Sequence, residues 1–350
     1  MPSPECYRQV ARGIAGYLAS RQQPDGAFPG PDHYGRAFAV LLWSQFGEEF
    51  APHVTAALRH LREHLPPDHG EFNAYALLHY PDRSAVADLL GRLRFGHRHS
   101  ANWILLRAVC RSHPSCHSHS PCHSDPDPER SEEEGEESIS CNAAHEVSGL
   151  RLPNLWHSPP RATLEARAAL LRYGRGDLIY DRPGALSDTY HAFCGALLVD
   201  LWRNLGVPWA RAAAIRAARA VQPHILPDGD ALHVGRGKGQ IFGYGALLYL
   251  LEAAAQITGD DTLRADADRV FAFLLRFRRG DGSFPLVLDA DEPPDPWRPD
   301  ASRPGWYDYN RYADYAPFLG VYLMKAGEHV NPSDAPAATP ALPRTSRASP

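Results

Sequence analysis

The sequence has little of what several classes of protein require. No stretch of the 350 residues approaches the ~18 apolar residues of a membrane span. The segment from Met1 to Gln9 has no apolar core of the kind that signal peptides carry. The net charge of -5 leaves no basic excess for neutralising phosphate groups. These absences argue against a membrane protein and a general nucleic-acid binder, and they predict a cytoplasmic chain.

Complete nucleotide-binding and diphosphate-binding motifs are also missing. The glycine-rich run GRGKG, at 235–239, lacks the GxxxxGK[ST] frame and the preceding strand of a phosphate-binding loop. The segment QQPDGAF, at 22–28, resembles a surface repeat of terpenoid cyclases and prenyltransferases, but the chain has neither DxDD nor DDxxD. A cyclase-like protein therefore stays a rival interpretation, and we expect no cofactor.

The middle of the chain differs in composition from the rest. Four of the six cysteines lie between Cys110 and Cys141. The run SHPSCHSHSPCHS, at 112–124, has zinc-ligand residue types without a zinc-finger spacing, and the acidic run at 125–138 is nearly free of apolar residues. Such a segment cannot bury enough surface to offset its ordering entropy. We predict a disordered insertion over 112–150, a disordered tail over 327–350, no metal site and no disulfide framework.

Two kinds of apolar pattern alternate along the remaining chain. Amphipathic patterns at helical spacing cover 7–20, 53–64, 84–95, 161–173, 209–221 and 262–277. Patterns that are apolar almost all round cover 35–46, 73–80, 102–110, 189–205, 241–256 and 312–325. A helix of the second kind must be buried on every side. The alternation predicts an all-α fold, an (α/α)6 toroid of six hairpins over 5–326, with an open helical array as the alternative.

Polar and aromatic residues gather where each predicted inner helix begins. In a closed ring these six N-termini share one mouth, and their dipoles favour anionic ligands there. Aromatic faces can stack on sugar rings while polar groups bond the hydroxyls, so we expect an oligosaccharide or polysaccharide partner. The candidate substrate-binding residues are His33, Tyr34, Arg36, Asn73, Asn102, Trp103, His233, Arg236, Lys238, Gln240, Tyr244, Trp306, Tyr309, Asn310, Arg311 and Asp314.

The hairpin order, the PDGAF-type loops and the segment GRGKGQIFGYGALLYLLEAA, at 235–254, resemble the (α/α)6-toroid carbohydrate-active superfamily. That group holds six-hairpin glycosidases and heparinase- or alginate-lyase-type enzymes, and the likeness covers most of 5–325. It implies either a glycan lyase, in which a His and a Tyr act as base and acid, or a glycoside hydrolase with a pair of carboxylates. It does not select one family.

Residues for a lyase are present at the start of the fourth predicted inner helix. In SDTYHAF, a helix cap at Asp188 would place His191 one turn in. His191 could take the proton beside a uronate carboxylate, and Tyr190 or Tyr312 could return one to the leaving oxygen. Arg236 could neutralise that carboxylate, together with its neighbour Lys238.

A hydrolase would instead use carboxylates. Asp188 and Asp230 are the candidates, while Asp228 in the Asp-Gly pair has the residue type of a tight turn. A toroid that binds a glycan or a protein partner without catalysis is a further alternative, because the insertion contains CHSDPDPERSEEE, which resembles the in-frame product of a mobile bacterial repeat. In the cytoplasm, an enzyme of this kind would act on an imported oligosaccharide.

Overall fold

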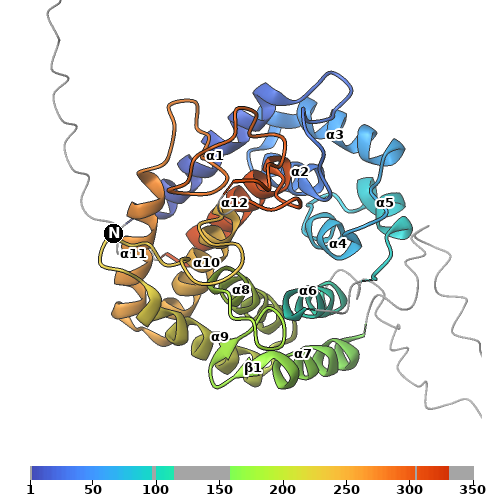
Figure 1. The fold of residues 1–350 in the computed structure, drawn as a ribbon. Coiled ribbons are helices and arrows are strands. Elements are labelled where there is room, and N and C mark those ends of the chain that lie inside the picture. The colour runs from blue at the N-terminus through green and yellow to red at the C-terminus, as the bar shows by residue number, and fades with distance from the viewer. Residues whose placement is uncertain (1, 97–99, 114–157, 304–305, 331–350) are drawn as a thin grey trace, which may run out of the picture.

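Two concentric rings of helices make up the fold (Figure 1). The computed structural model describes residues 2–96, 100–113, 158–303 and 306–330. The outer ring contains α1 (Pro4–Arg21), α3 (Ala51–Glu63), α5 (Ala87–Arg92), α7 (Pro159–Tyr173), α9 (Pro208–Val221) and α11 (Asp261–Leu275). The inner ring contains α2 (Gly35–Ser44), α4 (Gly70–Leu78), α6 (Ala101–Ser112), α8 (Asp188–Leu205), α10 (Ile241–Thr258) and α12 (Tyr312–Gly327).

The inner ring is closed. Each inner helix packs against the next one along the chain, and α12 packs back against α2. The outer helices from α3 onward each pack against the inner helix that precedes them, whereas α1 packs mainly against α12 (Figure 1). This confirms the predicted (α/α)6 toroid, and the open array is wrong.

Burial follows the two sequence patterns. Along α10, every residue from Ile241 to Ala255 is buried, whereas α9 buries one face made of alanines and Val221. By length and composition α10 could cross a membrane, but 83% of that window is buried inside the ring. Small residues bring neighbouring inner helices together, since a Cβ at Gly195 would lie 2.5 Å from Leu250 Cδ2. The apolar-all-round pattern thus marks ring-core helices.

Several boundaries differ from the sequence-based ones. The pattern over 84–95 forms a 3-10 turn at Ser84–Val86 followed by the short α5. Ser112 ends α6 and Gly327 ends α12, and both are packed into the fold, so neither belongs to a disordered segment. Most of the predicted insertion and tail lies outside the described residues.

Asp-Gly turns precede three inner helices, as their residue types predict. Asp25, Asp228 and Asp281 each accept a hydrogen bond from the backbone N–H two residues on. The glycine that follows each has a positive φ, between 86° and 95°, which L side chains rarely adopt. A short antiparallel pair, β1 (Gly174–Arg175) and β2 (Leu178–Ile179), leads toward α8. These loops bring polar side chains to the N-terminal ends of the inner helices.

Candidate functional site

A cavity of about 240 Å³ lies at the N-terminal ends of the inner helices, and we call it the mouth pocket. Side chains from loops and first turns all around the ring line it. They are His33, Tyr34, His69, Phe72, Ser100, Asn102, Trp103, Arg182, Tyr190, Arg236, Phe242, Tyr309, Asp314 and Tyr315. The predicted meeting of inner-helix starts around one hollow is therefore present in the structure.

Asp314, in the first turn of α12, is the acidic residue of this lining. Its Oδ1 accepts three backbone hydrogen bonds, from the N–H groups of His33, Tyr34 and Gly35 at 2.9, 2.9 and 2.8 Å. Its Oδ2 is buried and has no hydrogen-bond partner in the described part of the chain. One oxygen thus fixes the carboxyl group across the α12–α2 junction, and the other is left for a ligand.

The environment of Asp314 favours its protonated form. Burial, together with the nearby carboxylate of Asp32, raises the pKa of Asp314 to about 7. Burial also raises the pKa of Asp32, but its ion pair of 2.9 Å with Arg36 and a hydrogen bond from the Arg36 backbone N–H oppose that rise and favour its ionised form. Asp314 is therefore the carboxyl group that can hold a proton near neutral pH.

Two imidazole rings line the same pocket as this carboxyl group. The rings of His33 and His69 stack with centroids 4.2 Å apart. Burial, followed by the positive charge of Arg311, lowers the pKa of His33, so its ring is neutral at pH 7. A neutral imidazole has a nitrogen lone pair that can accept a proton. The backbone N–H of His33 donates to Asp314 Oδ1, so the backbone that carries this ring is anchored to the carboxyl group.

Arg236 places a guanidinium group, paired with a carboxylate, on the α8–α10 side of the pocket. Its Nε and Nη2 donate to Asp181 Oδ2 at 3.1 and 2.6 Å, and Asp181 is buried. The guanidinium lies 4.4 Å from the ring centroid of Tyr190 and 5.3 Å from that of Tyr309. Arg182 also lines the pocket. These cations suit a carboxylate-bearing ligand.

Aromatic rings provide the remaining walls. Tyr34 stacks on Phe72 with centroids 4.4 Å apart, and the Trp103 ring meets Phe72 edge-on at 4.9 Å. Tyr309 is half-buried and stacks on Tyr307. Such faces suit the C–H surface of a sugar ring, and Asn102 offers an amide at the same pocket.

Many residues predicted to bind substrate are brought together here. The mouth pocket includes His33, Tyr34, Asn102, Trp103, Arg236, Tyr309 and Asp314, and also the predicted catalytic Tyr190. Burial raises the pKa of Tyr190, so its hydroxyl stays protonated at neutral pH. That these residues bind a substrate stays a prediction, whereas the structure shows directly that they line one pocket.

His191 and Asp188 are placed differently from what the SDTYHAF segment predicts. Both ring nitrogens of the fully buried His191 bond to the backbone, at Ile179 N (2.9 Å) and Ala217 O (2.9 Å). Asp188 bonds to His224 and to the backbone of Val234, while Ser187 is the helix cap. Neither residue lines the mouth pocket, because both hold α8 to its neighbouring loops and helix.

The other predicted catalytic residues also lie outside the mouth pocket. The Tyr312 hydroxyl donates to Phe284 O at 2.9 Å from a buried position. Asp230 accepts from the Tyr244 hydroxyl at 2.6 Å, which occupies both side chains in a loop contact. Further predicted binding residues that do not line the pocket are Arg36, Asn73, His233, Lys238, Gln240, Trp306, Asn310 and Arg311.

Sequence reasoning missed part of the lining. His69 and Arg182 occur in loops before inner helices, in HGEF and in GDLIYDRP, and their position there was the available signal. Phe242 and Tyr315 lie in the first turns of α10 and α12, where the apolar pattern made them indistinguishable from core residues. In the described part of the chain no cluster of three or more His, Cys, Asp or Glu could hold a metal ion, and Cys6, Cys110 and Cys194 form no disulfide bond there.

Comparison with known proteins places the fold. No protein-family model and no curated protein matches the sequence. A polysaccharide lyase superposes with a TM-score of 0.57 at 10% identity, covering 95% of this chain and 99% of its own. An inactive α-1,6-mannanase variant of a Salegentibacter species, in complex with α-1,6-mannotriose, gives 0.56 at 13% identity over 92% and 98%. An unsaturated glucuronyl hydrolase of a Bacillus species gives 0.52 at 13% over 92% and 97%. At such identities the likeness shows the (α/α)6 toroid.

Proposed function

We propose that the chain is a carbohydrate-active enzyme that cleaves a uronate-containing oligosaccharide in the mouth pocket. The observation that carries this proposal is the buried, unpartnered Oδ2 of Asp314, a carboxyl group whose pKa is raised to about 7 by burial and by Asp32. Asp314 lines the same hollow as His33 and Arg236. The structural neighbours, which include a polysaccharide lyase and glycoside hydrolases, support the same class of substrate.

The groups in the pocket suit cleavage by β-elimination. Arg236 and Arg182 bind the uronate carboxylate, which makes the adjacent C5 proton more acidic. The neutral His33 ring takes that proton, the C4–C5 double bond forms, and the C4–O bond breaks. Asp314 gives its proton to the leaving oxygen, so the products are an unsaturated uronate and a new chain end. His33 leaves protonated and Asp314 ionised, and a proton returned from His33 through solvent restores both.

Hydrolysis is the second candidate, because the same two residues also suit it. Asp314 would protonate the glycosidic oxygen while His33 accepts a proton from an attacking water. The pair of carboxylates expected for a glycosidase is not present in the described lining, where Asp314 is the acidic side chain. The geometry therefore favours elimination over hydrolysis.

The test is an incubation with uronate oligosaccharides, followed by absorbance at 230 nm and by a reducing-end assay. Elimination raises both signals, and hydrolysis raises reducing ends alone. Asp314→Asn keeps an oxygen for the three backbone N–H groups but removes the acid, so we expect kcat to fall by about 100-fold or more.

The matched control is Asp295→Asn, at an exposed turn where an amide oxygen can still accept from Trp297 N. It should retain the parent rate, and both variants should unfold at the parent temperature. Equal activity of Asp314→Asn and the parent protein would contradict the proposed role of Asp314. Absence of both signals with every uronate oligosaccharide would contradict the proposed enzyme.

A further inference from the structure

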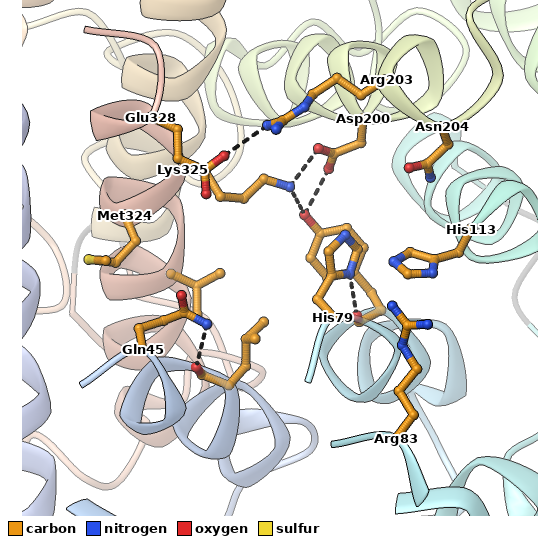
Figure 2. A pocket seen from close by; sticks show the side chains of 13 residues that line it. Gln45, His79, Arg83, His113, Asp200, Arg203, Asn204, Met324, Lys325 and Glu328 are labelled. Carbon is orange, nitrogen blue, oxygen red and sulfur yellow. Dashed lines mark hydrogen bonds and ion pairs between the residues drawn. The ribbon is translucent and has the colours of Figure 1, made fainter. Parts of the chain in front are cut away.

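A second cavity, of about 490 Å³, lies at the opposite end of the ring, and we call it the base pocket (Figure 2). It is formed where the inner helices α2, α4, α6, α8 and α12 end. Aromatic side chains fill the ring between the two cavities, since Phe318 stacks on Phe38 at 5.0 Å and on Tyr322 at 4.4 Å. The base pocket is therefore separate from the mouth pocket, and the proposed cleavage does not use it.

A buried ion pair forms the floor of the base pocket. Lys325 Nζ donates to Asp200 Oδ1 at 2.5 Å and to the Tyr75 hydroxyl at 2.7 Å (Figure 2). The hydroxyls of Tyr75 and Tyr249 both donate to the Asp200 carboxylate, each at 2.7 Å. An ammonium group has three N–H donors, and these contacts use two of them. Both Asp200 oxygens are occupied. The Lys325 ammonium also lies 4.7 Å from the ring centroid of Tyr249, and its third N–H has no hydrogen-bond acceptor among the described residues.

The charges around the base pocket leave a positive excess. Arg203 is paired with Glu328 at 3.0 Å, and Lys325 is paired with Asp200. Arg83 donates one bond, from Nε to Leu78 O at 3.2 Å, and has no carboxylate partner among the described residues. Among the cations that line the pocket, Arg83 is thus the one whose charge is not paired with a described carboxylate. Arg83 is also exposed, so a ligand can reach this side from solvent.

Two imidazole rings face the same side as Arg83. His79 and His113 meet edge-on with centroids 4.6 Å apart, and Figure 2 shows both near the Arg83 side chain. Burial, helped by Lys325 and Arg83, lowers the pKa of His79 to about 4, and burial with His79 and Arg83 lowers that of His113 to about 3. Both rings are therefore neutral at pH 7. The positive charges of Lys325 and Arg83, which help to lower these pKa values, would attract an anion.

The facing side of the base pocket is apolar. Leu41, Val321 and Met324 line it, and Figure 2 shows Met324 across the cavity from Arg83 and His113. A thioether packs well against an aromatic ring. A hydrated inorganic ion would leave this side unused, whereas an organic acid would contact both sides.

We propose that the base pocket binds a small organic carboxylate with an apolar, aromatic body. Its carboxylate group contacts Arg83 and the remaining donor of Lys325, and its ring lies against Leu41, Val321 and Met324. A volume of about 490 Å³ accommodates a molecule of this size.

Phenylacetate is the probe, titrated into the full chain at pH 7 by calorimetry. We expect saturable binding of one molecule per chain. Arg83→Gln should weaken it by about 10- to 100-fold, since a charge-assisted hydrogen bond is lost. The matched control is Arg59→Gln, another exposed arginine that donates to one backbone carbonyl, Pro24 O, and it should bind like the parent.

Two further ligands separate the contributions of charge and shape. Phenylacetamide has the same body without the charge and should bind at least about 10-fold more weakly, and inorganic phosphate should not bind measurably. Met324→Trp fills the apolar side without changing any charge and should abolish binding. Asp314→Asn, in the mouth pocket, should bind phenylacetate like the parent, which keeps this test independent of the proposed cleavage.

The outcomes that overturn the proposal are equally specific. They are no binding of phenylacetate, equal binding of phenylacetamide, unchanged affinity in Arg83→Gln or Met324→Trp, and phosphate binding as tight as phenylacetate. The last result would indicate a simple anion site.

Discussion

At the scale of single residues, the carboxyl group of Asp314 is central to the chemistry that we propose for the mouth pocket. Three backbone N–H groups on its Oδ1 would by themselves lower its pKa, yet burial and the Asp32 carboxylate outweigh them. Asp32 differs because Arg36 pairs with it. Burial raises the pKa of both carboxyl groups, which lie 282 residues apart in the chain, but the Arg36 charge opposes this rise at Asp32.

This difference predicts a pH dependence. The proposed cleavage requires protonated Asp314, so kcat/KM should fall as the pH rises above about 7, approaching tenfold per pH unit. It also requires neutral His33, whose pKa is lowered by burial and by Arg311, so the acid limb should lie below the usual histidine value of about 6.5. The measurement is the rate on a uronate oligosaccharide from pH 4 to 9. A rate that is flat between pH 6 and 9 would contradict the role of Asp314.

His191 shows what residue types alone could not establish. A Tyr-His pair at the start of an inner helix has the composition of a lyase site, but the face of α8 that carries His191 points toward α9 and β2, where the backbone uses both ring nitrogens. Asp314 differs from His191, because the sequence predicted it only as a substrate-binding residue and we now propose it as the acid. Its special role depends on Asp32 and on the loop before α2, which only the folded chain brings beside it.

At the scale of elements, the start of α2 must lie unusually close to the start of α12. A Cβ at Gly35 would be 1.9 Å from Ala313 O, so no larger residue fits without moving the backbone. This close approach is what lets the N–H groups of the α2 loop reach Asp314 Oδ1. The packing of these two helices therefore fixes the proposed acid.

Gly35→Ala tests that coupling. The clash with backbone should destabilise the protein by about 1–3 kcal/mol and should also lower kcat by displacing Asp314. Gly16→Ala is the control, because Gly16 is an exposed position in α1 with nothing within 4 Å of an added Cβ. It should raise stability by about 0.5–1 kcal/mol and leave the rate unchanged. Thermal unfolding and initial rates measure both effects, and a Gly35→Ala protein as stable and active as the parent would refute the coupling.

The elements themselves were predictable because each helix type has its own pattern. Burial on all sides requires apolar residues all round, so helices such as α10 could be recognised and ordered from the sequence. Loop conformation was less accessible, because it depends on contacts between distant segments. Asp188 illustrates this, since its partners His224 and Val234 lie in the loops after α9. The toroid could thus be inferred, while the choice of side chains at its mouth could not.

At the scale of the whole molecule, one buried ion pair joins much of the inner ring. Lys325 on α12 contacts Asp200 on α8 and the hydroxyl of Tyr75 on α4, and Tyr249 on α10 also donates to Asp200. The four inner helices α4, α8, α10 and α12 therefore meet at one carboxylate near the base pocket. The ring is closed by apolar packing, and we expect this network to help fix how those helices sit relative to one another.

Removing one partner of this ion pair should be costly, whereas removing both should not. Lys325→Met leaves the Asp200 charge buried and should destabilise the protein by about 3–5 kcal/mol. The double variant Asp200→Asn with Lys325→Met removes both charges and should recover most of that loss, as urea unfolding at pH 7 would measure. Burial alone would raise the pKa of Asp200, but Lys325 and His79 outweigh it, so the pKa of Asp200 is lowered in the folded protein. The stability that this carboxylate contributes is therefore present at neutral pH and is lost as the pH falls below its unfolded pKa of about 3.9. If Lys325→Met were as stable as the parent protein, the network would be incidental and the ring would be held by its apolar contacts alone.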